Sequence, residues 1–254
     1  MTRPPPPPWS RRRPPPRAGN IETYRELREA ITGGRFQPNE RLVEAELVTM
    51  FGAGRSAVRA ALVRLDQEGL VTREPNRGAR VRLISGREAI EIEQVRIALE
   101  KMLARFAAER VTGADLDDLV ATVGEMRERV GEGDPLGYSE LNARFHRRIW
   151  AIADHQLAAS LLTTLKSQSI RFQYRTILQP GRAQTSLQEH QAILAALAAH
   201  DPDACEEAMA EHLRQVVSTL QRAIAAQPAH GPWRHPTAVP TTRETASATS
   251  TATP

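Results

Sequence analysis

The stretch from Ile31 to Val81 constrains the fold more than any other part of the chain. It contains a segment, residues 55–68, whose apolar residues recur with the spacing of a helix buried along one face. These residues are Val58, Ala61, Leu62 and Leu65. Two segments that alternate apolar and basic residues then flank a Pro-Asn-Arg-Gly turn at 75–78, which predicts a β-hairpin.

Two more helices are expected ahead of this one, at 20–32 and 43–51, because glycines end each apolar stripe. Residues 20–84 are therefore predicted to form a winged helix-turn-helix domain of three helices plus a β-hairpin wing. From residue 85 to 227 the periodicity is helical throughout, which predicts an all-α antiparallel bundle of six or seven helices. The fold class is mainly α.

The bundle helices are bounded by glycine, proline and aspartate. They are expected at 86–110, 113–131, 136–153, 156–178, 186–199 and 203–225. Ser186 has the spacing of a capping box and is expected to begin the fifth of them. Asp201 followed by Pro202 is expected to cap the last. Aromatic residues make up only 4% of the chain, so the core must be aliphatic.

The third helix of the N-terminal domain has cationic side chains free at its N-terminal end. Packing of its apolar face leaves Arg55, Ser56 and Arg59 pointing outward. A guanidinium there can donate two hydrogen bonds to a guanine in the major groove, or it can hold phosphates. Arg77 and Gly78 at the wing tip suit the minor groove, where Arg favours the negative potential and Gly allows close approach. These five residues are the predicted DNA contacts.

Charge and composition set apart the two ends of the chain. Residues 1–19 hold five arginines and no acid, whereas residues 86–227 hold 16 basic and 20 acidic residues. Residues 1–19 are expected to be a disordered basic Pro/Arg arm that adds non-specific DNA affinity. Residues 228–254 are rich in Thr, Ala, Ser and Pro and are expected to be disordered.

No apolar run is long enough for a transmembrane helix, and the N-terminus lacks the apolar core of a signal peptide. The single cysteine, Cys205, cannot form an internal disulfide and suits a reducing compartment. A cytoplasmic protein, nucleoid-associated when bound to DNA, is expected, with no membrane partner.

Histidines lie on the inward faces of three separate bundle helices, at His146, His190 and His212. Three imidazoles plus one oxygen ligand form a familiar set for Zn²⁺ or Ni²⁺. One inward histidine alone is more often a hydrogen-bonded core residue, but three on three helices favour a divalent metal. Asn142 lies one turn before His146 and also faces partly inward.

Three segments between residues 31 and 81 carry a resemblance to a known family. ITGGRFQPNERLVEAEL, GRSAVRAALVRLDQEGLV and PNRGARV resemble the winged-helix domain of the GntR family of bacterial transcription regulators. This chain has Gly54 and Ala57 where that family usually has Ser and Pro. VRIALE, LNARFHRRI, EHQAIL and HDPDACEEAMAEHL resemble the all-helical FCD effector domain of the FadR-type branch.

The resemblance implies a metal held by Asn142, His146, His190 and His212, with Asn142 standing where the family often has Asp. A neutral amide oxygen is a poorer metal ligand than a carboxylate. The resemblance also implies a small carboxylate effector beside the metal, for which Arg96, Arg171 and Arg175 are the candidate contacts. Glu100, one turn after Arg96, could instead be a purely structural partner of that arginine. These features assign effector binding and dimerisation to residues 85–227.

The expected function is a DNA-binding transcription regulator, with repression as the expected sign. It is expected to act as a homodimer on a palindromic operator, because one recognition helix covers only a half-site. A metal sensor, in which the ion itself is the signal, is one alternative. A metal-dependent enzyme is the other. Against an enzyme, Glu189 adjoins His190 but should point about 100° away on a helix, which leaves no clear general base at the metal.

Overall fold

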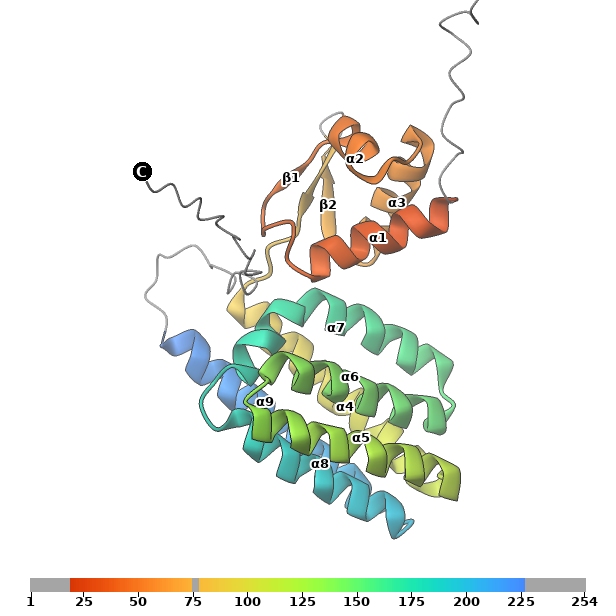
Figure 1. The fold of residues 1–254 in the computed structure, drawn as a ribbon, viewed down its shortest axis with the longest axis vertical. Coiled ribbons are helices and arrows are strands. Elements are labelled where there is room, and N and C mark those ends of the chain that lie inside the picture. Colours follow the sequence, from red (N-terminus) through yellow and green to blue (C-terminus); the bar gives the residue numbers. More distant parts are fainter. Residues whose placement is uncertain (1–18, 75–77, 227–254) are drawn as a thin grey trace, which may run out of the picture.

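The computed structural model describes residues 19–74 and 78–226, which form an N-terminal head and a helical bundle (Figure 1). The predicted arm up to residue 18, the wing-tip residues 75–77 and the tail from residue 227 lie outside the described part. No helix in the described part is long and apolar enough to cross a membrane.

The head contains three helices and a small antiparallel sheet. Its elements in chain order are α1 (Asn20–Thr32), β1 (Arg41–Leu42), α2 (Glu44–Phe51), α3 (Arg55–Gln67), β2 (Val71–Glu74) and β3 (Gly78–Val81). The sheet order is β1-β3-β2, with Thr72 opposite Arg80 and Leu42 opposite Ala79. The apolar stripe of α3 is buried in the head core as its spacing predicts. The winged helix-turn-helix prediction is confirmed.

Strand β1 is the element of the head that the sequence did not reveal. It is two residues long, so it shows no alternation that could identify it. Its partner strand β3 shapes it instead: the amide of Val81 donates to the carbonyl of Glu40, and the amide of Asn39 donates to the carbonyl of Val81. The predicted two-stranded wing is therefore a three-stranded sheet within the described residues.

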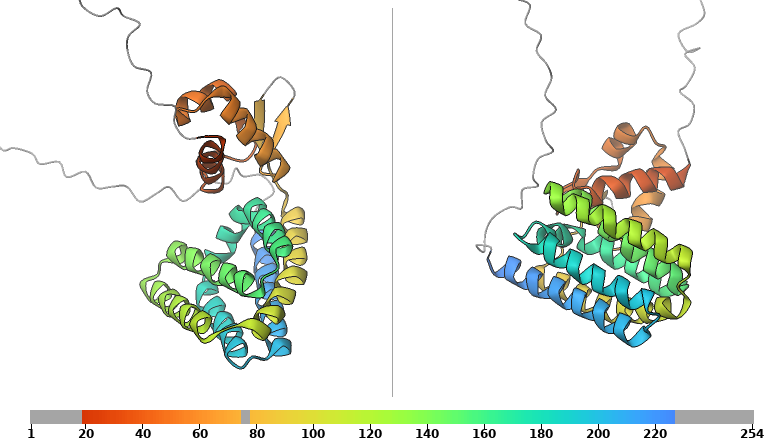
Figure 2. Two further views of the ribbon diagram at one scale, coloured as in Figure 1. Left: turned by 90° about the vertical axis from the view of Figure 1, so that its right-hand side faces the viewer. Right: turned by 60° about the horizontal axis from the view of Figure 1, so that its bottom comes forward.

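The bundle contains six helices in the described residues, all close to the predicted positions. They are α4 (Gly86–Arg110), α5 (Gly113–Glu132), α6 (Pro135–Ala153), α7 (Gln156–Ile177), α8 (Arg182–Ala198) and α9 (Pro202–Ala225). In both views of Figure 2, α4 runs alongside α9, and the remaining helices complete an antiparallel bundle around an aliphatic core. Asp201 caps α9 through the amide of Ala204, as expected.

The predicted start of α8 at Ser186 is wrong, because the helix begins four residues earlier. Gly181 adopts a φ of 74°, which ends the α7–α8 connection and lets the chain turn directly into α8 at Arg182. Ser186 therefore lies inside the helix, buried on its inner face. The capping-box spacing of this serine therefore does not mark a helix end.

Helix α7 is a bundle helix that packs against the head (Figure 1). The guanidinium of Arg28 on α1 hydrogen-bonds Glu68 at the end of α3 and Ser167 on α7. The side-chain amide of Gln168 donates to the carbonyl oxygen of Glu68 at 2.7 Å. Tyr24 also donates to the Glu68 carboxylate, at 2.5 Å. These hydrogen bonds connect the end of α3, the predicted DNA-recognition helix, to the bundle.

Candidate functional site

Three buried histidines meet in the middle of the bundle. His146 on α6, His190 on α8 and His212 on α9 have their nearest ring nitrogens within 4.8 Å of one another. The Nε2 atoms of His146 and His190 are 3.4 Å apart. The structure thus brings together the three residues that helical periodicity placed on separate inward faces.

Each of the three rings has an acceptor at its other nitrogen. The Nδ1 of His146 lies 2.5 Å from Glu100, that of His212 lies 2.7 Å from Glu189, and that of His190 lies 2.6 Å from the carbonyl oxygen of Ser186. An Nδ1–H that donates to such an acceptor fixes the tautomer and leaves Nε2 with a free lone pair. This arrangement of ring plus acceptor is the one that orients histidine as a metal ligand.

The pKa values of all three imidazoles are lowered, and burial is the largest cause in each. For His190 and His212 the pKa lies well below its usual range, because the neighbouring histidines add to the effect of burial. Neutral rings are the metal-binding form. Two neutral Nε2 atoms at 3.4 Å cannot hydrogen-bond each other, whereas one ion bonded to both at about 2.0–2.1 Å with tetrahedral angles would place them about 3.3 Å apart.

Asn142 lies one turn before His146 on the same helix, α6. Its Oδ1 atom is buried and has no hydrogen-bond partner within residues 19–74 and 78–226. An orphaned buried acceptor is costly, so it indicates a missing partner. The three nitrogens and this oxygen fit a divalent ion bound by three imidazoles and an amide oxygen.

Arg96 is buried and points inward as predicted, but carboxylates of its own helix already engage it. It contacts Glu93 at 2.5 Å and Glu100 at 2.6 Å, and only 3% of its surface is exposed. Burial alone would raise the pKa of Glu100, but Arg96 and His146 hold it well below its usual range. These contacts favour a structural role, in which Arg96 neutralises the carboxylate that orients His146. Arg96 also lines the cavity beside the histidines, so its contact with an effector stays a prediction.

The other two candidate effector contacts are Arg175 and Arg171. Arg175 donates to the carbonyl of Ala223 at 2.8 Å and does not line the cavity beside the histidines. Arg171 lies on α7, but its side chain is outside the described part. Arg182, which the sequence did not single out, is 6% exposed and makes a two-pronged pair with Glu189, with both distances 2.8 Å.

A cavity of about 40 Å³ opens beside the histidines, and we call it the inner cavity. Its lining includes Asn142, His146, His212, Arg182 and Lys166. Sequence reasoning missed Lys166. The only signal available was rarity, because the chain holds just two lysines, Lys101 and Lys166.

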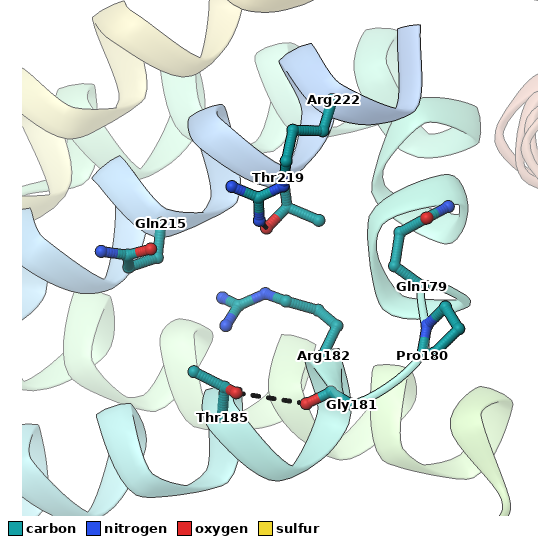
Figure 3. A pocket seen from close by; sticks show the side chains of 8 residues that line it. All are labelled: Gln179, Pro180, Gly181, Arg182, Thr185, Gln215, Thr219 and Arg222. Carbon is teal, nitrogen blue, oxygen red and sulfur yellow. Dashed lines mark hydrogen bonds between the residues drawn. The ribbon is translucent and has the colours of Figure 1, made fainter. Parts of the chain in front are cut away.

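A second cavity of about 280 Å³, the outer cavity, lies at the start of α8. Figure 3 shows the guanidinium groups of Arg182 and Arg222 reaching into it from α8 and α9, with Thr185 and Thr219 nearby. Arg182 lines both cavities, so its pair with Glu189 stands between the outer cavity and the histidines.

The predicted DNA contacts on α3 are exposed at the start of the helix. Gly54 caps it in an extended conformation, and Arg55, Ser56 and Arg59 are all exposed. The side chain of Arg59 contacts Glu44 on α2 at 2.7 Å, a pairing that DNA would have to replace. The helix thus presents free backbone amides and two guanidinium groups on one end of the head.

Two DNA contacts were predicted at the tip of the wing, Arg77 and Gly78. Arg77 lies outside the described residues. Gly78 has a φ of 87°, and a Cβ there would lie 2.6 Å from the carbonyl oxygen of Leu42. Strand β1 therefore requires glycine at this position whether or not DNA approaches it, so its smallness has a cause inside the head.

Comparisons with known proteins agree with this arrangement. Residues 21–81 match the family described as "Bacterial regulatory proteins, gntR family", and residues 91–215 match the FCD domain. The chain is 30% identical over 203 residues to the HTH-type transcriptional repressor RspR of Escherichia coli strain K12, covering 80% of this chain and 89% of that protein. It is 30% identical over 220 residues to the HTH-type transcriptional repressor NanR of Citrobacter rodentium, covering 76% and 82%.

Among solved structures, that of E. coli McbR/YncC is similar with a TM-score of 0.70 and 22% identity. The match covers 80% of this chain and 97% of that one. At this identity the likeness establishes the fold, a winged helix-turn-helix head followed by a helical bundle.

Proposed function

The chain belongs to the GntR family of bacterial regulatory proteins and carries an FCD domain, and from this premise we propose that it is a metal-containing, carboxylate-responsive repressor. It is a DNA-binding transcription regulator, and its matched relatives are regulators rather than enzymes. The observation that carries the proposal is the convergence of His146, His190 and His212, each with its Nδ1 hydrogen-bonded.

We assign the metal to these three histidines and Asn142. Zn²⁺ and Ni²⁺ both suit three imidazoles and an oxygen. When bound, the ion would supply a Lewis-acidic position that attracts an anionic oxygen. The chain's own groups hold the ligands in place: Glu100 and Glu189 accept hydrogen bonds from two rings, and Arg96 and Arg182 neutralise those two carboxylates.

The effector would be a small carboxylate that reaches the metal from the inner cavity. Effector binding would alter how α7 holds the head, because α7 lines the cavity and also contacts Arg28 and Glu68. The protein would act as a homodimer on a palindromic operator, since α3 of one head covers only a half-site. Repression fits the names of the relatives, RspR and NanR.

The test begins by selecting an operator from a random DNA pool with the purified protein. Binding of the selected duplex is then measured by fluorescence anisotropy with Zn²⁺ or Ni²⁺, after chelation, and with a panel of small carboxylates. Release by a carboxylate only from metal-loaded protein supports the proposal. If chelation alone releases the duplex and no carboxylate does, the protein is a metal sensor. A selected sequence without two-fold symmetry would contradict the dimer.

The Arg59→Ala variant is expected to bind the selected operator about 5- to 150-fold more weakly, from the loss of a bidentate contact to one base pair. Affinity for a scrambled duplex should fall much less, because phosphate contacts dominate there. Anisotropy titrations of both duplexes at a fixed salt concentration measure the two effects.

Glu44→Gln is the matched control for this experiment. It removes the carboxylate that holds Arg59 in the free head at 2.7 Å. Operator affinity should stay the same or rise, because less must be broken on binding. Equal losses of Arg59→Ala on both duplexes would show that Arg59 contacts only the backbone.

The Asn142→Asp variant is expected to bind Zn²⁺ at least about tenfold more tightly, since it offers a charged oxygen in place of the orphaned amide oxygen. Competition against a coloured chelator measures this. Ser139→Asp is the control, because Ser139 lines the same cavity from the same helix. If both variants gain equally, general charge explains the effect and Asn142 is not a ligand.

A further inference from the structure

The cations that line the inner cavity in the described part of the chain are paired with carboxylates, with one exception. Arg96 contacts Glu93 and Glu100, and Arg182 contacts Glu189. Lys166 also lines the cavity, and no carboxylate of the described residues lies within 4.0 Å of its ammonium. Among the described residues that line the cavity and their ion-pair partners, three cations and three carboxylates cancel, so a bound divalent ion would leave two excess positive charges.

The ammonium of Lys166 lies over an aromatic ring rather than beside an acid. Its Nζ lies 5.3 Å from the centre of the Trp150 ring, whose own N–H is directed to Glu100. Burial, with Arg96 adding to it, lowers the pKa of Lys166 to about 8, so the ammonium form predominates at neutral pH. The ammonium is partly exposed and forms no ion pair among the described residues, so it is free to pair with an anion that enters the cavity.

The size of the inner cavity limits what that anion can be. Its volume of about 40 Å³ has room for about three water molecules before any side chain moves. A short acid with two carboxylates can displace those waters while supplying the two negative charges that balance the site. A bulky ligand would have to open the bundle.

We propose that Lys166 binds the second acidic group of a small dianionic effector whose first carboxylate reaches the metal. The inference rests on the proposed function and deepens it, because it names the effector as a short dicarboxylic acid. Lys166 acts as a specificity-determining residue: it separates dianions from monoanions of similar size. Arg96 does not make that distinction, since Glu93 and Glu100 already match its charge, and the metal would receive one carboxylate from either class of acid.

The test uses isothermal titration of Zn²⁺-loaded full-length protein with malonate and succinate as dianions and with acetate and propionate as monoanions. The wild type should bind the best dianion at least about tenfold more tightly than either monoanion. Lys166→Met should weaken dianion binding about 10- to 100-fold, the range of one charge-assisted hydrogen bond, and should change monoanion binding less than about threefold.

Lys101→Met is the matched control, because Lys101 is the other lysine and its ammonium pairs with Glu206 at 2.9 Å outside the cavity. It should behave as the wild type. Lys166→Gln, which keeps a polar end, provides a second variant if the methionine variant folds poorly. Zn²⁺ affinity, measured by chelator competition, should be unchanged in all of them.

The possible failures can be told apart. If dianions and monoanions both bind and release DNA but Lys166→Met weakens them equally, the assignment of Lys166 is wrong and the proposed function stands. Equal affinity of the wild type for dianions and monoanions has the same meaning. If no acid binds metal-loaded protein, the carboxylate effector itself is wrong, and this inference falls with it.

Discussion

The Glu100→Gln variant is expected to lose about 3–5 kcal/mol of unfolding free energy in the metal-free protein, the range found when one partner of a buried ion pair is removed. Glu100 is 0% exposed and its carboxylate contacts Arg96, His146 and the Trp150 N–H. Glutamine keeps the shape but not the charge, so Arg96 would remain buried with Glu93 as its single acid. Urea unfolding followed by circular dichroism measures the loss.

The same substitution should weaken metal binding about 10- to 100-fold, because the acceptor that orients His146 would lose its charge. Glu91→Gln on the same helix is the control: its partner Arg87 is 90% exposed, and the change should cost less than about 0.5 kcal/mol. If Glu100→Gln and Glu91→Gln unfold alike, Glu93 alone suffices for Arg96, and the buried cluster is not a stabilising unit.

The metal-free protein is expected to lose stability steeply as pH falls below about 6.5, the usual histidine pKa. Burial holds the pKa of His190 and of His212 well below that value in the folded state. Below about pH 6.5 the unfolded chain therefore takes up two protons that the folded chain does not. Stability is complete above this pH and falls by about 2.7 kcal/mol per pH unit until the folded-state pKa values are reached.

Urea unfolding at a series of pH values between 5 and 8 tests this, with a fixed ionic strength. A double variant, His190→Gln with His212→Gln, should lose most of the slope below pH 6.5. His200→Asn changes an exposed histidine in the α8–α9 connection and should keep it. A wild-type slope no greater than that of the double variant would show that the two rings are already protonated in the folded protein.

The sequence predicted a residue's burial and direction best where these depend on a single helix. The buried face of α3 and the inward direction of Arg96 follow from helical periodicity alone. The same periodicity placed His146, His190 and His212 on inward faces, because each is one turn from residues of the core. Whether three inward faces converge at one height depends on helix lengths and crossing angles, and the structure supplies these.

The sequence failed where a residue's role depends on another helix. Glu189 does point away from His190, as the helical spacing required, and for that reason it reaches His212 on α9. Ser186 had the spacing of a cap, but its carbonyl serves the ring of His190. Lys166 follows no local pattern, since its significance comes from Trp150 and from the acids that it does not contact.

Neighbouring residues of helix α7 contact different parts of the protein, and this limits how strongly a ligand in the inner cavity can change operator binding. Lys166 faces the inner cavity, while Ser167 and Gln168 hydrogen-bond the head. Each such bond contributes about 0.5–1.5 kcal/mol net, so breaking both can change the preference for one head pose by about 1–3 kcal/mol. Operator occupancy could then shift about 5- to 150-fold per head. If an effector acts through these bonds as proposed, transcription would change gradually with effector concentration. Full repression or full expression would then need both heads of the proposed dimer.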